Sequence, residues 1–539
     1  MYRYQLLIPR DWMNFDIRER YGKYMAEKVN LDALIPREDL ETTTYVQRGR
    51  KKDTVSISDL LSDSFFLLNI YKPDFQRETT EWDYEKIGSF VDSFIGYELI
   101  PAIILWQSSG GNVFVIDGAH RLSSLIAWLN DDYGDGIISR KFYDGNIPEE
   151  QLLIANKTRK YIQKNIGAYQ QYKNALINPD IYDQSVVMKA RLLSNAAIQL
   201  QWVEGDVSSA EKSFFNINQK AAPINPTEID LIKSRKKANC ISARAIMRMG
   251  MGHKYWVNFE EGIQTQIEEL SKEVFELMFM PKLSTPIKTL DVPMCGKHNS
   301  NSLTLIYEFV NICNSEHNFS DIDITGDETI TCLKNVRKIA RLINSNHPSS
   351  LGLHPLAYFY ARNGAFRVSA FYAFAAFVID LEKSKKKNLF IKHRKDFEKI
   401  YYANSSLVQV IVRKSRSALA GMKNVSIFFY EILNNLESGI QADAVINEIR
   451  KKSEFAYLPE INHEWTLFEE IPADFSNNQK SEVFITEALS KAPCCKICGG
   501  LLHRNAISVD HIERKQDGGK ATIENAQLTH PYCNTGVKN

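Results

Sequence analysis

The chain of 539 residues is too long for one ordinary core and predicts roughly three or four domains. Its apolar content of 44% and charged content of 24% are typical of a soluble globular protein, and its formal net charge of +1 gives no overall indication of a nucleic-acid partner. The N-terminus lacks the apolar core of a signal peptide, and the longest apolar run, at 371–381, is too short to span a bilayer. These features predict a cytoplasmic protein with reduced thiols and no membrane partner.

Residues 71–129 show the alternation expected of an α/β domain. Asp83 can cap a helix that continues to residue 95 with apolar residues on one face. An apolar strand is expected at 100–106, then a Gly-Gly turn, then a second strand at 113–116 that leads into a helix. Asp117, His120 and Arg121 therefore fall at a strand end and a helix N-terminus, where unpaired N–H groups and the helix dipole favour an anion.

Two sequence motifs in this region are together similar to a known family. FQR at 75–77 is followed by Trp82, an apolar helix and IDGAHR at 116–121. This combination resembles the ParB/sulfiredoxin-like nucleotide-binding family with its DGQQR box, which GmrSD-type restriction systems carry. The segment FFNINQKAAPINPTEIDLIKSR at 214–235 is similar to a later element of the same family.

The resemblance implies a ParB/sulfiredoxin-like α/β domain over 55–240 that binds and hydrolyses a nucleoside triphosphate to control an attached nuclease. Within it, Arg77 and Arg121 would hold phosphates with their guanidinium forks. The box departs from the usual one, because Ala119 and His120 stand in place of two glutamines. Binding of a nucleoside triphosphate is still expected, whereas its hydrolysis is left open. The implied nucleotide site is lined by Gln76, Arg77, Asp117, Gly118, His120, Arg121 and Asn218.

The middle of the chain carries no catalytic motif. Residues 241–455 predict a mainly α-helical domain, and the basic stretch KSKKKNLFIKHRK within it is either a solvated helix face or a surface that follows duplex DNA. Residues 456–490 are acidic and fit a linker. Residues 1–54 are treated as an N-terminal extension.

The last fifty residues hold four of the eight cysteines. Cys495 and Cys498 form one pair, and His530 and Cys533 form a second pair about thirty residues later. Two such pairs can close a tetrahedral structural zinc site, and so small a segment needs a metal in place of a large core. Cys494 offers an alternative register with Cys498.

Asp510 and His511 lie between these pairs, where one or two short strands are expected at 502–509 and a short helix containing Asn525 at 522–528. Hydrolysis of a phosphodiester needs an activated water and a cation for the developing phosphate charge. His511 can accept the proton of the water at neutral pH, and the adjacent carboxylate of Asp510 points the other way from a strand and can hold Mg²⁺.

Residues 491–539 resemble an HNH endonuclease of the ββα-metal type with a zinc-knuckle frame. The resemblance is carried by CxxC, VDHI, the Gly-Gly turn, the Glu-Asn of IENAQL and the closing Cys-Asn. The resemblance implies His511 as general base, Asp510 and Asn534 as ligands of a catalytic Mg²⁺ or Mn²⁺, and Asn525 as a constraint on the loop. His530 stands where a cysteine is commoner, and the usual lysine after the final Asn is displaced to Lys538.

The sequence therefore predicts a multidomain α+β protein: a nucleotide-regulated HNH endonuclease that cuts double-stranded DNA, foreign or modified, in anti-phage defence. The alternatives are a non-cutting DNA-binding regulator with a nucleotide clamp and a structural zinc knuckle, and a homing or packaging nuclease without a role for nucleotide. A second copy of the chain or a companion defence protein is left open as a partner.

Overall fold

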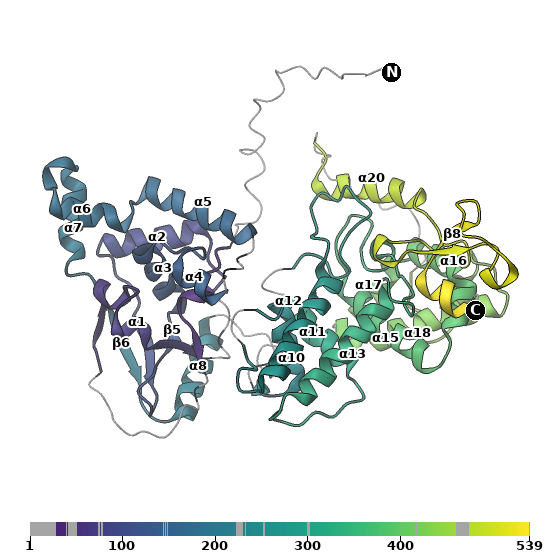
Figure 1. Ribbon diagram of the computed structural model, residues 1–539, viewed down its shortest axis with the longest axis horizontal. Helices are drawn as coiled ribbons and strands as arrows, with labels where there is room; N and C mark the ends of the chain where they lie inside the picture. Colours follow the sequence, from purple (N-terminus) through teal and green to yellow (C-terminus); the bar gives the residue numbers. More distant parts are fainter. Residues whose placement is uncertain are drawn as a thin grey trace, which may run out of the picture. The chain divides into compact units, whose positions relative to one another are not determined.

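The computed structural model describes residues 28–537 apart from 39, 41–50, 74–75, 77–78, 144, 146, 148, 222–229, 232, 252–253, 299–301, 416–417 and 460–473. It forms two compact units, Met1–Asn225 and Pro226–Asn539, each described by itself below (Figure 1). None of its described helices is long and apolar enough to cross a membrane.

A mixed six-stranded sheet in the order β1-β3-β5-β4-β6-β2 forms the centre of the first unit. β4 is antiparallel to β5 and parallel to β6, and β3 is parallel to both β1 and β5. The central strands are apolar because both faces are covered, and Leu105 and Val115 have no exposed surface. The strands are β1 (Arg37–Glu38), β2 (Thr54–Ser56), β3 (Ile70–Pro73), β4 (Ile103–Gln107), β5 (Val113–Asp117) and β6 (Ala197–Val203).

The helices of this unit confirm two of the elements expected from the sequence. α2 begins after Asp83, whose side chain accepts a hydrogen bond from the Lys86 N–H at 2.8 Å, and α3 begins directly after Gly118. The strand expected at 100–106 begins only at Ile103, because Pro101 has no N–H to give to the sheet. The helices are α1 (Phe65–Leu68), α2 (Tyr84–Ile95), α3 (Ala119–Asn130), α4 (Ile137–Phe142), α5 (Glu149–Asn165), α6 (Tyr169–Ile177), α7 (Gln184–Leu193) and α8 (Val207–Ala221).

The second unit confirms a mainly helical middle region. Its core is rich in aromatic side chains, and Phe374 of α15 stacks on Phe429 of α18 with ring centroids 4.1 Å apart. The helices are α10 (Ala238–Met247), α11 (Glu261–Phe279), α12 (Ser302–Cys313), α13 (Asp327–Ile343), α14 (Pro355–Tyr358), α15 (Val368–Lys383), α16 (Lys387–Ala403), α17 (Ser406–Lys414), α18 (Ala418–Glu437) and α19 (Val445–Arg450).

The segment expected as an acidic linker contains a helix. α20 (Asn477–Ser490) begins with a capping box at Ser476 and buries Ile485 and Leu489. Leu489 and Ile485 belong to the same apolar core as the helical body. Residues 460–473 of the expected linker lie outside the described residues.

The C-terminal segment packs on the helical body within the second unit, where it lies beside α16 (Figure 1). It has two antiparallel strands, β7 (Ser508–His511) and β8 (Ala526–Thr529), followed by the π-helical turn Cys533–Val537. The strand expected at 502–509 is shorter than predicted, because the 3-10 turn Arg504–Ala506 precedes it. The helix expected at 522–528 is wrong, because residues 522–525 form a turn and residues 526–528 pair with β7 in strand β8.

Gly118 is the residue on which the β5–α3 junction depends. Its φ is +98°, and a Cβ there would lie 2.4 Å from the Cδ1 of Ile103. We expect Gly118→Ala to destabilise this unit by about 2–4 kcal/mol, from left-handed strain plus overpacking. Gly111→Ala is the matched control, since its φ is +91° but no atom lies within 4 Å of its added Cβ.

The measurement for this prediction is hydrogen exchange of peptides from β4, β5 and α3 in the full chain. Gly118→Ala should lower protection clearly more than Gly111→Ala does. Equal loss of protection in the two variants would show that the close approach of residue 118 to Ile103 does not contribute to the destabilisation.

Candidate active site and metal cluster

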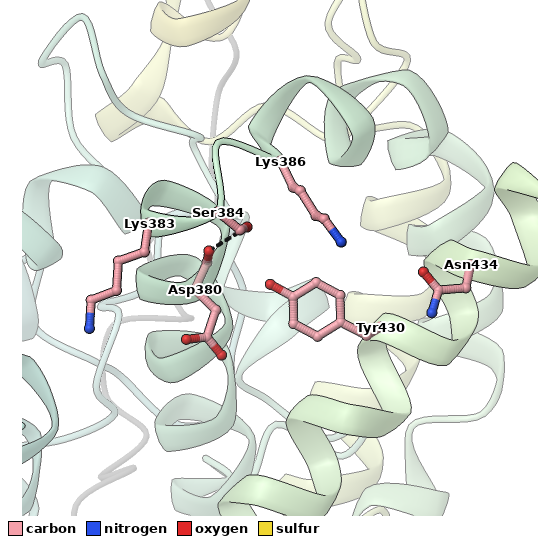
Figure 2. A pocket seen from close by; sticks show the side chains of 6 residues that line it. All are labelled: Asp380, Lys383, Ser384, Lys386, Tyr430 and Asn434. Carbon is pink, nitrogen blue, oxygen red and sulfur yellow. Dashed lines mark hydrogen bonds between the residues drawn. The ribbon is translucent and has the colours of Figure 1, made fainter.

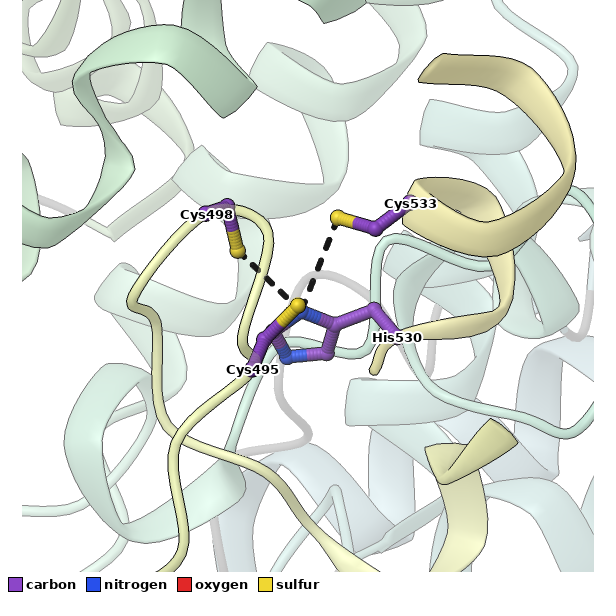
Figure 3. Close-up of side chains that lie close together, drawn as sticks. All are labelled: Cys495, Cys498, His530 and Cys533. Carbon is purple, nitrogen blue, oxygen red and sulfur yellow. Dashed lines mark hydrogen bonds between the residues drawn. The ribbon is translucent and has the colours of Figure 1, made fainter. Parts of the chain in front are cut away.

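Four side chains from the two ends of the C-terminal segment meet in one buried cluster (Figure 3). The ligand atoms of Cys495, Cys498, His530 and Cys533 all lie within 4.8 Å of one another. The Nδ1 of His530 is 3.3 Å from the Sγ of Cys498 and 3.9 Å from that of Cys533. Cys494 is exposed and lies outside the cluster, with its thiol 3.6 Å from the carbonyl of Ala492. The cluster therefore uses the Cys495 register.

The chemistry of the cluster suits zinc. A tetrahedral zinc with thiolate and imidazole ligands separates its ligand atoms by roughly 3.5–3.8 Å, as the bond lengths require. Hydrogen bonds from Cys498 and Cys533 hold the pKa of Cys495 well below its usual range, and burial lowers the pKa of His530. The Nε2 of His530 lies 3.0 Å from the carbonyl of Leu501, which fixes Nδ1 as the atom that faces the sulfurs.

Helix α16 of the helical body forms one wall of this cluster. Arg394 is fully buried and lies with its Nη1 3.3 Å from the Nδ1 of His530. Its Nε donates to Glu398 at 2.7 Å, and the second carboxylate oxygen of Glu398 accepts the N–H of Leu501 at 2.9 Å. A Cβ on Gly500 would lie 2.4 Å from the Nε of Arg394, so the knuckle can approach only because residue 500 is glycine.

The candidate catalytic pair lies on β7. Asp510 is buried and accepts a hydrogen bond from Gln527 of β8 at 2.9 Å, while His511 is half-buried. Because successive side chains of a strand alternate, Asp510 shares a face with Ser508 and His511 lies on the other face. The amide nitrogen of Asn534 donates to the hydroxyl of Ser508 at 2.8 Å, so Asn534 lies on the Asp510 face.

Asn525 fastens the loop that follows His511. Its side-chain oxygen accepts the N–H of Glu513 at 2.7 Å, and its amide nitrogen donates to the carbonyls of Glu513 and Lys520 at 3.1 and 2.8 Å. The Gly-Gly turn is needed for this closure, because a Cβ on Gly519 would lie 2.0 Å from the carbonyl oxygen of Glu513. Asn525 therefore acts on the backbone of the loop.

In the first unit, the IDGAHR motif spans the end of β5 and the start of α3. Arg121 forms an ion pair with Asp117 at 2.6 Å and donates to the carbonyls of Pro101 and Ala102. The N-cap residue of α3 is Gly118, which has no side chain to cap the helix. The structure thus brings Asp117 and Arg121 together, and Arg121 is held at the start of β4 rather than directed outward.

His120 lies in the same helix turn and is covered by Glu81 and Trp82 of the segment that follows FQR. Its Nε2 accepts the backbone N–H of Glu81 at 3.3 Å, and its ring stacks on Trp82 at 5.7 Å. Burial lowers the pKa of His120 to about 4, and the ammonium of Lys72 adds to this. The imidazole is therefore neutral at pH 7.

A buried charge network beside the motif was missed by the sequence analysis. Lys72 has no exposed surface and donates to Asp32 at 2.8 Å and to Thr79 at 3.1 Å, and Arg37 pairs with the same carboxylate. Asp32 and Arg37 lie in the expected N-terminal extension, whose β1 joins the sheet. The only signal in the sequence was a lysine in an otherwise apolar strand just before FQR.

The structure describes only some of the other residues that were expected to bind the nucleotide. The side-chain oxygen of Gln76 is buried and has no hydrogen-bond partner among the described residues. Asn218 lies in α8, but its side chain is outside the described part of the chain, as is all of Arg77. Lys538 is also outside it.

Comparison with known proteins gives two matches along the chain. Residues 57–235 match the N-terminal domain of the GmrSD restriction endonuclease family, and residues 495–539 match the HNH endonuclease family. No curated protein and no solved structure matches the chain.

Both matched families are endonucleases, which places the chain among the nucleases. More particularly, it joins a GmrSD-type N-terminal domain to a C-terminal HNH endonuclease domain with a Cys3His cluster, in a multidomain α+β fold. Both resemblances found in the sequence are thereby confirmed, and the roles of the individual site residues stay predictions.

Replacement of a cluster thiol should release zinc from the full chain. We expect Cys495→Ser to lower zinc content to well below one ion per chain and to loosen the segment after residue 490, since metal binding supplies its folding free energy. Cys494→Ser is the matched control, because that thiol is exposed and lies outside the cluster. Elemental analysis and limited proteolysis measure both effects, and equal zinc in the two variants would contradict the assignment.

Proposed function

We propose that the chain is a metal-dependent HNH endonuclease that cuts double-stranded DNA under the control of a nucleoside triphosphate bound by its N-terminal domain. The observation that carries the proposal is the β7–β8 hairpin with Asp510 and His511, closed by Asn525 and by the turn that bears Asn534, on the Cys3His frame. The N-terminal match to a restriction endonuclease supports action on foreign or modified DNA in anti-phage defence.

The catalytic roles follow from the chemistry of the side chains. His511 is the group that removes the proton of the attacking water, since a neutral imidazole nitrogen can accept a proton. Asp510 and Asn534 supply oxygen donors, which Mg²⁺ and Mn²⁺ prefer, and the Asn534 amide nitrogen is already directed to Ser508. A bound divalent cation would stabilise the charge that develops on the phosphate. Asn525 positions the His511 loop without touching substrate.

The nucleotide role draws on the first unit. A glycine with positive φ and an uncapped helix N-terminus at Gly118 let a phosphate approach the backbone. The buried side-chain oxygen of Gln76 has no hydrogen-bond partner among the described residues and is a polar atom that a ligand can satisfy. On binding, the guanidinium of Arg121 exchanges its contact with Asp117 for a phosphate contact.

His511→Ala should abolish cleavage without loss of fold or zinc. Removal of a general base typically lowers the rate roughly 10²- to 10⁴-fold. The assay is plasmid nicking by the full chain with Mg²⁺ or Mn²⁺, and His317→Ala in the helical body is the control. Full nicking by the His511 variant would remove His511 from the mechanism, and no nicking by the wild type on any DNA would favour the non-cutting regulator.

Arg121→Ala should weaken binding of the nucleoside triphosphate roughly ten- to a hundredfold, because a charge-assisted contact is lost. Cleavage should then lose its nucleotide dependence, and we expect loss of activity. Arg191→Ala, an exposed change on α7, is the matched control. Each triphosphate is titrated against cleavage of a susceptible DNA.

Wild-type cleavage that ignores every triphosphate tried, on a DNA that it cuts, would contradict the nucleotide control. The N-terminal domain would then be a DNA-recognition module, and the assignment of the cutter would stand.

A further inference from the structure

Helix α16 carries a row of exposed lysines that form no ion pair within the described part of the chain. Lys392, Lys395 and Lys399 are exposed and lie on one face of the helix, because they follow one another at intervals of three and then four residues. The ion pairs of this helix join Lys387 to Glu382 and Arg394 to Glu398, and among the described residues none of the three lysines takes part in one. Asp396 is exposed on the same face, four residues after Lys392, so three lysines stand against one aspartate and the face keeps a net positive charge.

This lysine row borders the HNH segment. The side chain of Lys395 packs on the knuckle, with its Cδ 3.1 Å from the position that a Cβ on Gly499 would take. One turn before Lys392, Asn388 accepts a hydrogen bond from the hydroxyl of Tyr532 at 3.0 Å. Tyr532 is two residues from Asn534, so the same helix face that carries the lysines leads to the candidate catalytic metal ligand.

A further exposed lysine, Lys386, directly precedes α16. A hollow of about 570 Å³ opens there between α15 and α18, and Lys386 reaches into it toward the ring of Tyr430 (Figure 2). Lys386 is exposed, and its ammonium lies 5.8 Å from the centre of that ring. The hollow is lined by Asp380, Lys383, Ser384, Lys386, Tyr430 and Asn434.

The dimensions and charge of this surface fit duplex DNA. α16 has 17 residues, so it is about 25 Å long, and DNA carries one negative charge for about each 1.7 Å of its axis. The HNH segment itself holds seven basic against four acidic residues at 491–539, which is a small excess for holding a polyanion. The lysine row of α16 beside this segment supplies further positive charge for contacts with the phosphates of DNA.

We propose that Lys392, Lys395 and Lys399, with Lys386 at the end of the row, bind the phosphate backbone of duplex DNA and hold it across the HNH site. The proposal rests on the proposed endonuclease function and names the surface of the helical body that this function uses. The lysines touch phosphates that are not cut, so they are binding residues and their loss leaves the chemical step intact.

The test replaces the three lysines of α16 by glutamine in the full chain. A second variant replaces three exposed lysines elsewhere on the helical body, Lys272 of α11 and Lys334 and Lys338 of α13. A third variant replaces the α16 lysines by arginine, which keeps the charge. Binding of a 30-base-pair duplex is measured by fluorescence anisotropy against salt concentration, in the His511→Ala background so that the DNA stays intact.

We expect the α16 glutamine variant to bind the duplex roughly ten- to a hundredfold more weakly at physiological salt, with a salt slope smaller by about three, near 0.9 per lost contact. The α11/α13 and arginine variants should keep the wild-type slope. With His511 present, the α16 glutamine variant should raise KM and leave kcat unchanged.

A wild-type salt slope for the α16 glutamine variant would overturn the proposal, as would the same loss of affinity in the α11/α13 variant. Loss in the arginine variant equal to that in the glutamine variant would also overturn it, since damage to folding rather than charge would then be the cause. Failure of the wild type to cut any DNA would count against the endonuclease function alone, because the binding measurements need no cleavage.

Discussion

The buried pair of Arg394 and Glu398 is the interaction on which the catalytic end of the molecule depends. A charged side chain without exposed surface is costly unless every polar atom is satisfied. Here the guanidinium meets the carboxylate of Glu398 and the carbonyls of Leu351 and Gly352, and the carboxylate also accepts Tyr358 and Leu501. Removal of either partner would leave an uncompensated buried charge beside the metal cluster.

Because of this buried pair, the HNH segment packs as part of the helical body and not as a separate domain. The cysteines of the cluster belong to the same apolar core as α15 and α18, and the knuckle glycines lie against side chains of α16. A ββα segment of about fifty residues has little surface with which to hold a duplex. Attachment to α16 gives it a longer face, and the proposed binding of DNA by the lysines on that face would give a nearly neutral chain a local positive surface for its substrate.

The proposed switch and the proposed cutter lie in different compact units. In the first unit the charged groups of the motif are already paired with one another, Arg121 with Asp117 and Lys72 with Asp32. A bound triphosphate would therefore have to compete with these internal partners. The difference in free energy between the internally paired state and the nucleotide-bound state is what nucleotide binding could supply for control of cleavage.

Much of the site followed from the sequence because its residues lie in short motifs with fixed local geometry. The pairs Cys495–Cys498 and His530–Cys533, the Asp510-His511 dipeptide and the Asp117-Gly118 turn were all recognisable without a fold. The helix capped by Asp83 was also predictable, since a cap and an apolar period are local properties. The short helix expected around Asn525 failed, because its residues respond to pairing with β7 and not to their own preferences.

The sequence by itself determined the two matched families and predicted the chemistry at each end of the chain: which residues would bind a metal, move a proton or contact a phosphate. Only the tertiary structure decided what supports that chemistry. Arg394 reaches His530 across 136 positions of sequence, and Lys72 meets Asp32 across 40. Such contacts leave no local pattern, because a buried charge is chosen by the partner that the fold brings to it, and that partner can lie anywhere in the chain.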